Sequence, residues 1–345
     1  MKKFIKITSV ILFIIITAGF FIIENLTKTS NGKLDTYLGV NLHLNKILNP
    51  SSINTQSIKE IREYLNSQST KWSNNPIPFS NIKNTTINVN SEEIPVRIYT
   101  PKDSSKLPII IYSHGGFWIG GSIDNYEGFC RKLSQNTNAI VISVGYPLAP
   151  ENPFPAAVND IYNVLQWTHK NASSINGDER YIALTGDSAG GNLSAAVSLM
   201  ARDKNGPPIT CQVLIYPSTN IFELNSKSWS YFANDLTISK KDMEKYISLY
   251  VPKKEDRKSP YVSPLLAKDF KKLPDTLIIT AEIDPLRDEG EAYGKKLKGA
   301  RINVEVTQYK GVPHGFITMD KITSKADTAL NEISLYLQKE FQNHK

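Results

Sequence analysis

From residue 109 onward, short runs of apolar residues alternate with longer amphipathic stretches. Continuous apolar runs of this length are typical of strands buried on both faces of a parallel sheet. We expect such strands at 109–112, 139–144, 181–185, 213–216, 277–280 and 304–309. The stretches with helical spacing lie at 156–169, 191–201 and 325–337. Strands and helices in alternation predict an α/β fold, with a mostly parallel central sheet and helices on both faces.

Different patterns precede this series. Residues 86–89 and 94–99 alternate apolar and polar side chains, which predicts an antiparallel hairpin. Residues 57–65 have the spacing of a short amphipathic helix, and a loop rich in asparagine and proline follows at 74–78. We therefore expect residues 26–80 to form a helical segment before a main domain at 81–345.

The interval between residues 216 and 277 interrupts the alternation. It is far longer than a crossover helix requires. It is also rich in large apolar side chains, namely Trp229, Tyr231, Phe232, Tyr246, Leu249, Tyr250 and Tyr261. Because so much apolar surface needs something to cover, we expect a helical insertion at about 218–272 over the carboxyl ends of the strands.

The amino terminus carries the longest apolar run. Residues 7–23 contain no charge and follow three lysines, Lys2, Lys3 and Lys6. The run is just long enough for a membrane-spanning helix, and Ala18-Gly19 is a poor cleavage site because Phe20 continues the run. We expect residues 1–25 to form an uncleaved signal anchor that leaves the rest of the chain outside the cytoplasm. A cleaved signal peptide, and hence a secreted protein, is the alternative.

Composition argues against a nucleic-acid partner and against a bound metal. The net charge is +7, but the lysines are scattered, and no basic stripe interleaved with aromatic residues suggests nucleic-acid binding. Cys130 and Cys211 are the two cysteines. Their separation fits no metal site, so we expect buried free thiols and neither a metal nor a cofactor.

The stretch from 181 to 196 carries the strongest chemical signal. A predicted strand leads into Gly186-Asp187-Ser188-Ala189-Gly190, and a helical pattern of small residues follows directly. In this G-x-S-x-G pattern, the glycines allow a tight turn that exposes the serine hydroxyl above the sheet edge. The amino end of the helix favours negative charge at the same place. The pattern predicts Ser188 as a nucleophile.

A serine hydroxyl is a poor nucleophile unless a general base takes its proton. In doubly wound hydrolases the order along the chain is the serine, then an aspartate or glutamate, then the histidine, and two of the five histidines follow Ser188. His314 lies in a loop bounded by glycine and proline, directly after the last predicted strand, whereas His344 is the penultimate residue. We therefore expect His314 to be the base.

The base needs a carboxylate to orient it, and this should follow the preceding strand. Three carboxylates lie there. Asp284 precedes a proline, which favours a turn at the strand end. Asp288 fits the charge at the start of the next helix, and Glu282 fits a solvated position. We expect Asp284 to be the orienting acid.

An oxyanion formed on the substrate needs backbone N–H donors. The residue after the nucleophile, Ala189, supplies one. The strand at 109–112 leads into His114-Gly115-Gly116, a loop whose glycines let the main chain approach an ester closely. We expect Gly115 and Gly116 to supply the other donors, and His114 to brace this loop.

Together, the motifs resemble those of the hormone-sensitive-lipase-like family of α/β-hydrolases, the esterase group that includes arylacetamide deacetylase. They are HGG at 114–116, YPLAPE at 146–151, GDSAGG at 186–191, DPLRDEG at 284–290 and HGF at 314–316. The resemblance implies the triad Ser188, Asp284 and His314, and the oxyanion donors Gly115, Gly116 and Ala189. It also implies a helical cap built from the amino-terminal segment and the insertion. Two positions depart from the family pattern: Phe117 replaces a third glycine, which should narrow the pocket, and Pro147 replaces an arginine.

This resemblance predicts a serine carboxylesterase or lipase-like hydrolase that cleaves carboxylic esters through an acyl-enzyme on Ser188. The expected substrate is a small-molecule or lipid-like ester. An amidase or deacetylase would use the same residues, so that alternative stays open. A non-catalytic ligand receptor on the same fold is a further alternative, although plant gibberellin receptors have lost the triad histidine and His314 is present here.

Overall fold

A central sheet of eight strands organises the protein in the computed structural model, which describes residues 2–48, 57–89, 92–102, 106–232 and 238–344. The strand order is β10-β9-β8-β7-β5-β6-β4-β3. Strands β5 to β10 pair in parallel, whereas β3 and β4 form an antiparallel pair that joins the edge of β6. The strands are β3 (Ile82–Val89), β4 (Glu92–Tyr99), β5 (Leu107–Ser113), β6 (Ile140–Val144), β7 (Gly177–Asp187), β8 (Cys211–Ile215), β9 (Asp275–Ile283) and β10 (Val304–Pro313).

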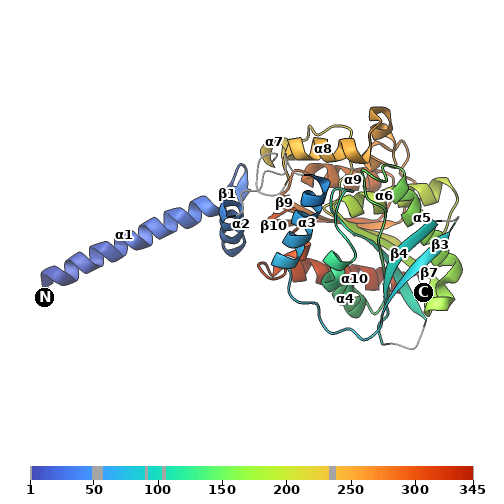
Figure 1. The fold of residues 1–345 in the computed structure, drawn as a ribbon, viewed down its shortest axis with the longest axis horizontal. Helices are drawn as coiled ribbons and strands as arrows, with labels where there is room; N and C mark the ends of the chain where they lie inside the picture. The colour runs from blue at the N-terminus through green and yellow to red at the C-terminus, as the bar shows by residue number, and fades with distance from the viewer. Residues whose placement is uncertain (1, 49–56, 90–91, 103–105, 233–237, 345) are drawn as a thin grey trace.

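Helices cover both faces of the sheet (Figure 1). One face packs against α5 (Ala156–Asn171), α6 (Ala189–Asp203) and α9 (Arg287–Gly299), and the other against α4 (Glu127–Thr137) and α10 (Lys325–Asn343). The central strands are apolar on both faces because side chains alternate between these two helix layers. Leu214 packs in the core beside α6 and α9, whereas its neighbours Val213 and Ile215 pack in the core beside α10. The predicted α/β fold with a mostly parallel sheet is confirmed.

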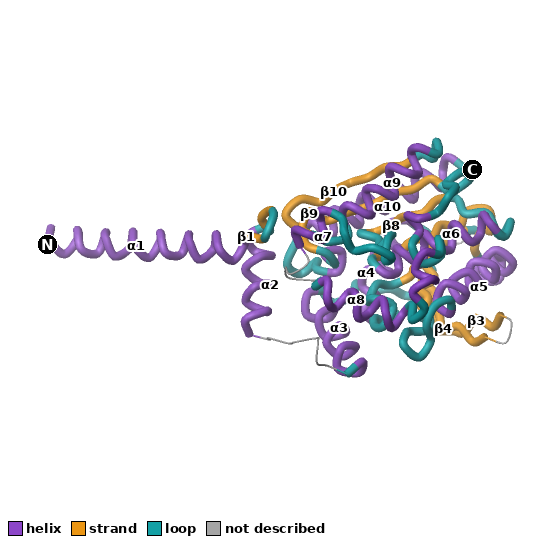
Figure 2. The backbone as a smooth tube through the Cα atoms, turned by 90° about the horizontal axis from the view of Figure 1, so that it is seen from above, coloured by secondary structure: helices purple, strands orange, loops and turns teal. Residues whose placement is uncertain are grey.

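Two segments far apart in sequence lie together outside the sheet. Helix α3 (Ile58–Trp72) comes from the amino-terminal segment, and α7 (Lys227–Phe232) and α8 (Lys240–Tyr250) come from the interval after β8. The three helices lie side by side in both views (Figures 1 and 2). Helix α3 starts at a capping box in which Ser57 and Glu60 bond reciprocally, and it runs seven residues past the predicted end at 65. Its last residue, Trp72, is buried, and this packing extends the helix.

Helix α1 (Lys2–Thr27) extends away from the body of the protein (Figure 2). Its segment Ile7–Thr27 is long and apolar enough to cross a membrane. A two-stranded ribbon of β1 (Lys28–Thr29) and β2 (Gly32–Lys33) then leads to α2 (Thr36–Leu48), which the sequence patterns did not resolve as separate elements. Leu34, Leu38 and Leu42 are buried and connect α2 to the body.

Candidate active site

Ser188 lies at the sharp turn between β7 and α6. Its backbone has φ 54° and ψ −116°, a strained conformation for a residue with a side chain. The turn is possible because its neighbours are glycines: a Cβ on Gly190 would lie 1.9 Å from the carbonyl oxygen of Ser113, and one on Gly186 would lie 2.5 Å from Gly190. The strand–turn–helix setting expected for Ser188 is therefore present.

Ser188, His314 and Asp284 form a chain of hydrogen bonds. Ser188 Oγ lies 2.8 Å from His314 Nε2, and His314 Nδ1 lies 2.8 Å from Asp284 Oδ2. A carboxylate can only accept, so the imidazole proton sits on Nδ1 and Nε2 is left to accept from the serine hydroxyl. Asp284 is fully buried, and Ser188 and His314 are each 7% exposed. The structure thus brings together the three residues predicted as nucleophile, base and orienting acid.

The parallel strands position these side chains. Ser188 follows β7, Asp284 follows β9 and His314 follows β10, so all three lie at the carboxyl edge of the sheet. Asp284 Oδ1 also accepts the N–H of Leu286 at 2.8 Å, which fixes the carboxylate plane. The ring of Tyr216 lies 4.6 Å from that of His314.

The competing carboxylates and the second histidine have other partners. Glu282 accepts the N–H of Gly311 at 2.8 Å, and Asp288 accepts the N–H of Ser228 at 2.8 Å. His344 lies at the end of α10, where its Nδ1 is 2.9 Å from the carbonyl oxygen of Glu340. Each of these groups therefore bonds a backbone group outside the triad.

The loop after β5 differs from the prediction in one respect. The N–H of Gly115 donates to Asp187 Oδ1 at 2.8 Å, so this hydrogen is not free for an oxyanion. The N–H groups of Gly116, Phe117 and Ala189 have no hydrogen-bond acceptor among the described residues. Assigning Gly115 as a donor is therefore wrong, because one N–H cannot serve both acceptors, and Phe117 offers the N–H that the sequence analysis overlooked.

Asp187 is the centre of a buried network that the sequence analysis missed. Besides Gly115, its carboxylate accepts the hydroxyls of Tyr112 at 2.7 Å and Tyr126 at 3.1 Å. Burial raises the pKa of Asp187, and these three donors counteract the rise. A Cβ on Gly115 would lie 2.5 Å from the same carboxylate, so this position requires glycine. Asp187 therefore fixes the start of the loop that carries the free N–H groups.

We expect Asp187→Ala to lower kcat by about 10–100-fold, somewhat less than removal of a whole oxyanion donor. The N–H of Gly115 would lose its acceptor, so the loop would be held less firmly. The substrate pocket itself would be unchanged, so KM should change little. Asp187→Asn keeps an Oδ1 that accepts from Gly115 and Tyr112, and it should restore most of kcat. Steady-state kinetics on a short p-nitrophenyl ester measures both variants. Equal kcat in the alanine and asparagine variants would contradict this positioning role.

His114 occupies the other side of the same loop. Its ring lies between Tyr146 and Tyr126, with centroids 4.3 and 5.9 Å away, and its Nδ1 is 2.8 Å from the carbonyl oxygen of Gly115. Burial lowers the pKa of His114 to about 4, so the ring is neutral near pH 7 and can donate its N–H to that carbonyl. Tyr146 donates its hydroxyl to the His114 carbonyl at 2.7 Å. The contacts agree with a bracing role.

Residues of α3 and α8 pack directly on this loop. The ring of Phe117 lies 4.9 Å from Tyr246 of α8, and Trp118 stacks on Tyr250 at 4.7 Å. From α3, Arg62 donates to the carbonyl of Ile119 at 2.7 Å. Phe117 and Trp118 both have positive φ, 57° and 60°. The large side chain of Phe117, which stands where the family pattern has a third glycine, therefore contacts α8.

Glu289 of α9 is a buried carboxylate close to the triad. Burial raises its pKa to about 8, and four donors oppose the rise. These donors are the N–H groups of Thr219 and Asn220, the hydroxyl of Ser218 and the indole N–H of Trp229 in α7. Ser218 in turn donates its N–H to the carbonyl of Ser188. Glu289 thus links α9 to the segment after β8 and to α7.

This pKa predicts a pH-dependent stability. Between the ordinary glutamate value of 4.5 and about 8, the folded state binds a proton that the unfolded state has lost. Stability therefore falls as pH rises through this window. We expect Glu289→Gln to reduce the fall in Tm between pH 5 and pH 8. Thermal unfolding at several pH values tests this, and an unchanged slope in Glu289→Gln would contradict it.

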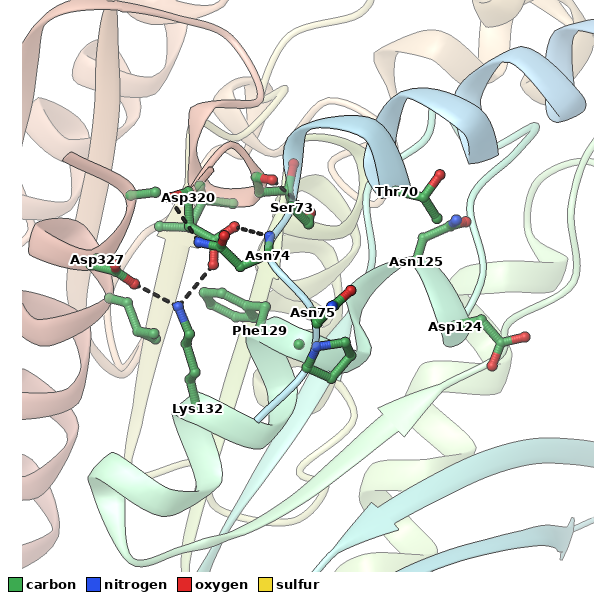
Figure 3. Close-up of a pocket in the computed structure, with 16 residues that line it drawn as sticks. Thr70, Ser73, Asn74, Asn75, Asp124, Asn125, Phe129, Lys132, Asp320 and Asp327 are labelled. Carbon is green, nitrogen blue, oxygen red and sulfur yellow. Dashed lines mark hydrogen bonds and ion pairs between the residues drawn. The ribbon is translucent and has the colours of Figure 1, made fainter. Parts of the chain in front are cut away.

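A separate pocket of about 140 Å³ is lined by residues from the end of α3, from α4 and from the segment after His314, among them Ser73, Lys132 and Asp320 (Figure 3). Lys132 forms ion pairs there with Asp320 at 2.8 Å and Asp327 at 2.7 Å, and Asp320 also accepts the N–H of Asn74. Ser73 donates to the carbonyl of Thr318 at 2.7 Å. These polar groups form hydrogen bonds and ion pairs with one another. Their bonds hold the segment after α3 against the segment that follows His314. Among the described residues, no group of three or more His, Cys, Asp or Glu could hold a metal ion.

Comparisons with known proteins agree with this geometry. Residues 110–318 match the family described as alpha/beta hydrolase fold. A carboxylic ester hydrolase of Mycobacterium tuberculosis is 38% identical over 247 residues, which cover 70% of this chain and 65% of that protein. An arylesterase of Saccharolobus solfataricus is 37% identical over 241 residues, which cover 70% of this chain and 78% of that protein.

Solved structures give the same result. A hyperthermophilic esterase from the archaeon Pyrobaculum calidifontis superposes with a TM-score of 0.85 at 35% identity, covering 89% of this chain and 98% of that one. An ester hydrolase from the metagenome of Lake Arreo superposes with a TM-score of 0.86 at 32% identity, covering 90% and 99%. With the motifs already described, these matches show that the chain belongs to the hormone-sensitive-lipase-like family of α/β-hydrolases.

Proposed function

We propose that this protein is a serine carboxylesterase. The observation that carries the proposal is the hydrogen-bonded chain Ser188–His314–Asp284 at a strained strand–helix turn. The strained turn fixes the hydroxyl beside a base whose tautomer is already correct. The esterases among its relatives support the same reaction.

In the proposed reaction, Ser188 Oγ attacks the carbonyl carbon of an ester while His314 Nε2 takes the hydroxyl proton. Asp284 holds the imidazole and stabilises the imidazolium that forms. His314 then gives the proton to the leaving alcohol, which leaves an acyl-enzyme on Ser188. Water attacks this acyl group with His314 again as the base, releasing the acid and restoring the serine.

The oxyanion formed in each step would be bound by the N–H groups of Gly116, Phe117 and Ala189. Removing one such donor costs about 3 kcal/mol of transition-state stabilisation. Ala189 is the first residue of α6, so the positive end of the helix adds to its effect. The reaction needs charge stabilisation from the backbone and no metal or cofactor.

We also propose that residues 26–80 and the insertion at about 218–272 form a cap over the catalytic domain at 81–345. The packing of Tyr246, Tyr250 and Arg62 on the loop after β5 supports this division. The cap would exclude water and shape the site for a small-molecule or lipid-like ester.

Helix α1 is proposed to anchor the enzyme in a membrane, with the catalytic domain outside the cytoplasm. Its segment Ile7–Thr27 is apolar, and the lysines before it favour the cytoplasmic side. Extraction from membranes by detergent but not by alkaline carbonate, together with an intact amino terminus in mass spectrometry, is the expected result. Loss of residues 1–25 from the mature protein would show a cleaved signal peptide instead.

The proposed activity is tested with matched esters and amides. The purified protein is assayed with p-nitrophenyl esters of increasing acyl length and with the corresponding p-nitroanilides. We expect turnover of the esters and much slower turnover of the anilides. Faster anilide turnover would identify an amidase or deacetylase, and binding without turnover of either series would identify a receptor.

A further inference from the structure

Helix α2 carries an apolar surface that no described part of the protein covers. Tyr37, Leu44, Ile47 and Leu48 are 66%, 45%, 64% and 75% exposed, and Val40 is half-buried between them in the helical sequence. At 100° per residue, these five side chains fall within an arc of roughly 100°, so they form one continuous stripe. We call them the α2 stripe. Isolated exposed apolar residues need no explanation, but a continuous stripe does.

The opposite side of α2 is already occupied. Leu38 and Leu42 are buried against the body, in the same core cluster as Trp72 of α3. They lie about 150° around the helix from the centre of the α2 stripe. The stripe therefore faces away from the catalytic domain.

The position of α1 shows what lies on that side. A Cβ on Gly39 of α2 would lie 3.1 Å from the carbonyl oxygen of Leu26 and from Thr27, so α2 contacts the last turn of α1. Both views show α2 running across the end of α1 and not along it (Figures 1 and 2). The 21 residues of the apolar segment span about 32 Å, which matches a hydrocarbon core of about 30 Å. If α1 spans a bilayer, α2 lies at its surface.

The charges near this junction suit a membrane surface. Glu24, the acidic residue of α1, is paired with Lys33 at 2.6 Å. Helix α2 has no acidic residue, so it carries no negative charge that anionic headgroups would repel. Tyrosine is favoured where the headgroups meet the hydrocarbon, which suits the place of Tyr37 on the stripe.

We propose that α2 is an interfacial helix whose stripe inserts into the outer headgroup boundary of the bilayer. Amphipathic helices bind membranes in this way, parallel to the surface. Asn45 and Lys71 bond α2 to α3, and Asn45 also bonds Gln68 at 3.3 Å, so the membrane contact would hold the cap near the lipid. This inference rests on the proposed anchoring by α1.

Site-specific fluorescence in vesicles tests the proposal. The full-length protein, carrying Leu44→Cys labelled with an environment-sensitive dye, is reconstituted into vesicles of phosphatidylcholine and phosphatidylglycerol. The matched control is Lys46→Cys, an exposed position about 160° away on the same helix. Leu12→Cys reports insertion of α1. Cys130 and Cys211 are fully buried, so the labelled wild type serves as the blank.

We expect the label at 44 to shift its emission to the blue, to be quenched by lipids with shallow nitroxide groups and to resist aqueous iodide. The label at 46 should behave in the opposite way. Equal access of iodide to both labels would overturn the proposal. Shielding at 44 without quenching by nitroxide lipids would show a second protein copy on the stripe, and would also overturn it. If the label at 12 is not quenched by deep nitroxide lipids, the anchor itself fails and the interfacial role fails with it.

Discussion

Replacing Ser188 with alanine is expected to abolish ester hydrolysis, with a fall in kcat of about 10⁵–10⁶-fold. The variant lacks the Oγ atom that would form the acyl-enzyme, although the proposed oxyanion donors and the proposed cap remain. The fold should survive, because the backbone of Ser188 keeps its bonds to Ile215 and Asn192. Hydrolysis of a short p-nitrophenyl ester measures the loss, and circular dichroism with thermal unfolding verifies the fold.

The matched control is Ser194→Ala. Ser194 lies on the same helix and is buried, and its hydroxyl has no partner in the described part of the chain. This variant should therefore keep wild-type kcat. A fluorophosphonate probe should label wild type and Ser194→Ala but not Ser188→Ala. Substantial turnover by a well-folded Ser188→Ala would contradict the proposed mechanism.

The sheet was predictable because its central strands are buried on both faces. In the sequence, such strands stand out as continuous runs of apolar residues, and each of the strands β5 to β10 was predicted from such a run. The predicted limits were too short at polar ends: β7 begins four residues before Tyr181, at Gly177, which pairs with Leu107 before the register shifts to Ile109 and Ile182. Pairing, unlike burial, leaves no apolar signal in the sequence.

The triad candidates were predictable for a geometric reason. Carboxyl ends of parallel strands meet at one edge of the sheet, so residues that directly follow strands are brought together. The oxyanion loop was less predictable, since its direction depends on Asp187, a partner 72 residues away from Gly115. Spacing alone does not show which of several consecutive N–H groups is already bonded.

The helices around α1 could be predicted only in part. An apolar run identifies α1, but α2 has apolar residues on two sides, which obscured its periodicity. One side packs on the body, and the other is the α2 stripe. Helix α3 was underestimated because the polar residues after Leu65 give no apolar spacing, although Trp72 anchors its end.

Asp284→Asn is expected to lower kcat by about 10³–10⁴-fold without changing the size of the side chain. The N–H of Leu286 donates to Oδ1 of Asp284, and it would hold the amide oxygen of the asparagine in that place. The amide NH₂ would then face His314 Nδ1 as a donor. The imidazole would have to accept at Nδ1 and carry its proton on Nε2, so it could no longer accept the proton of Ser188.

Asp288→Asn provides the matched control for this variant. Asp288 belongs to the same motif and accepts a backbone N–H from Ser228, but it does not contact the triad. It should keep kcat within a fewfold of wild type. Because the Asp284→Asn pocket keeps its shape, KM should change little, so the loss should appear in kcat and in the rate of reaction with the fluorophosphonate. If Asp284→Asn and Asp288→Asn had equal kcat, the carboxylate would not set the tautomer, and the base would have to be held by its neighbours, foremost the ring of Tyr216.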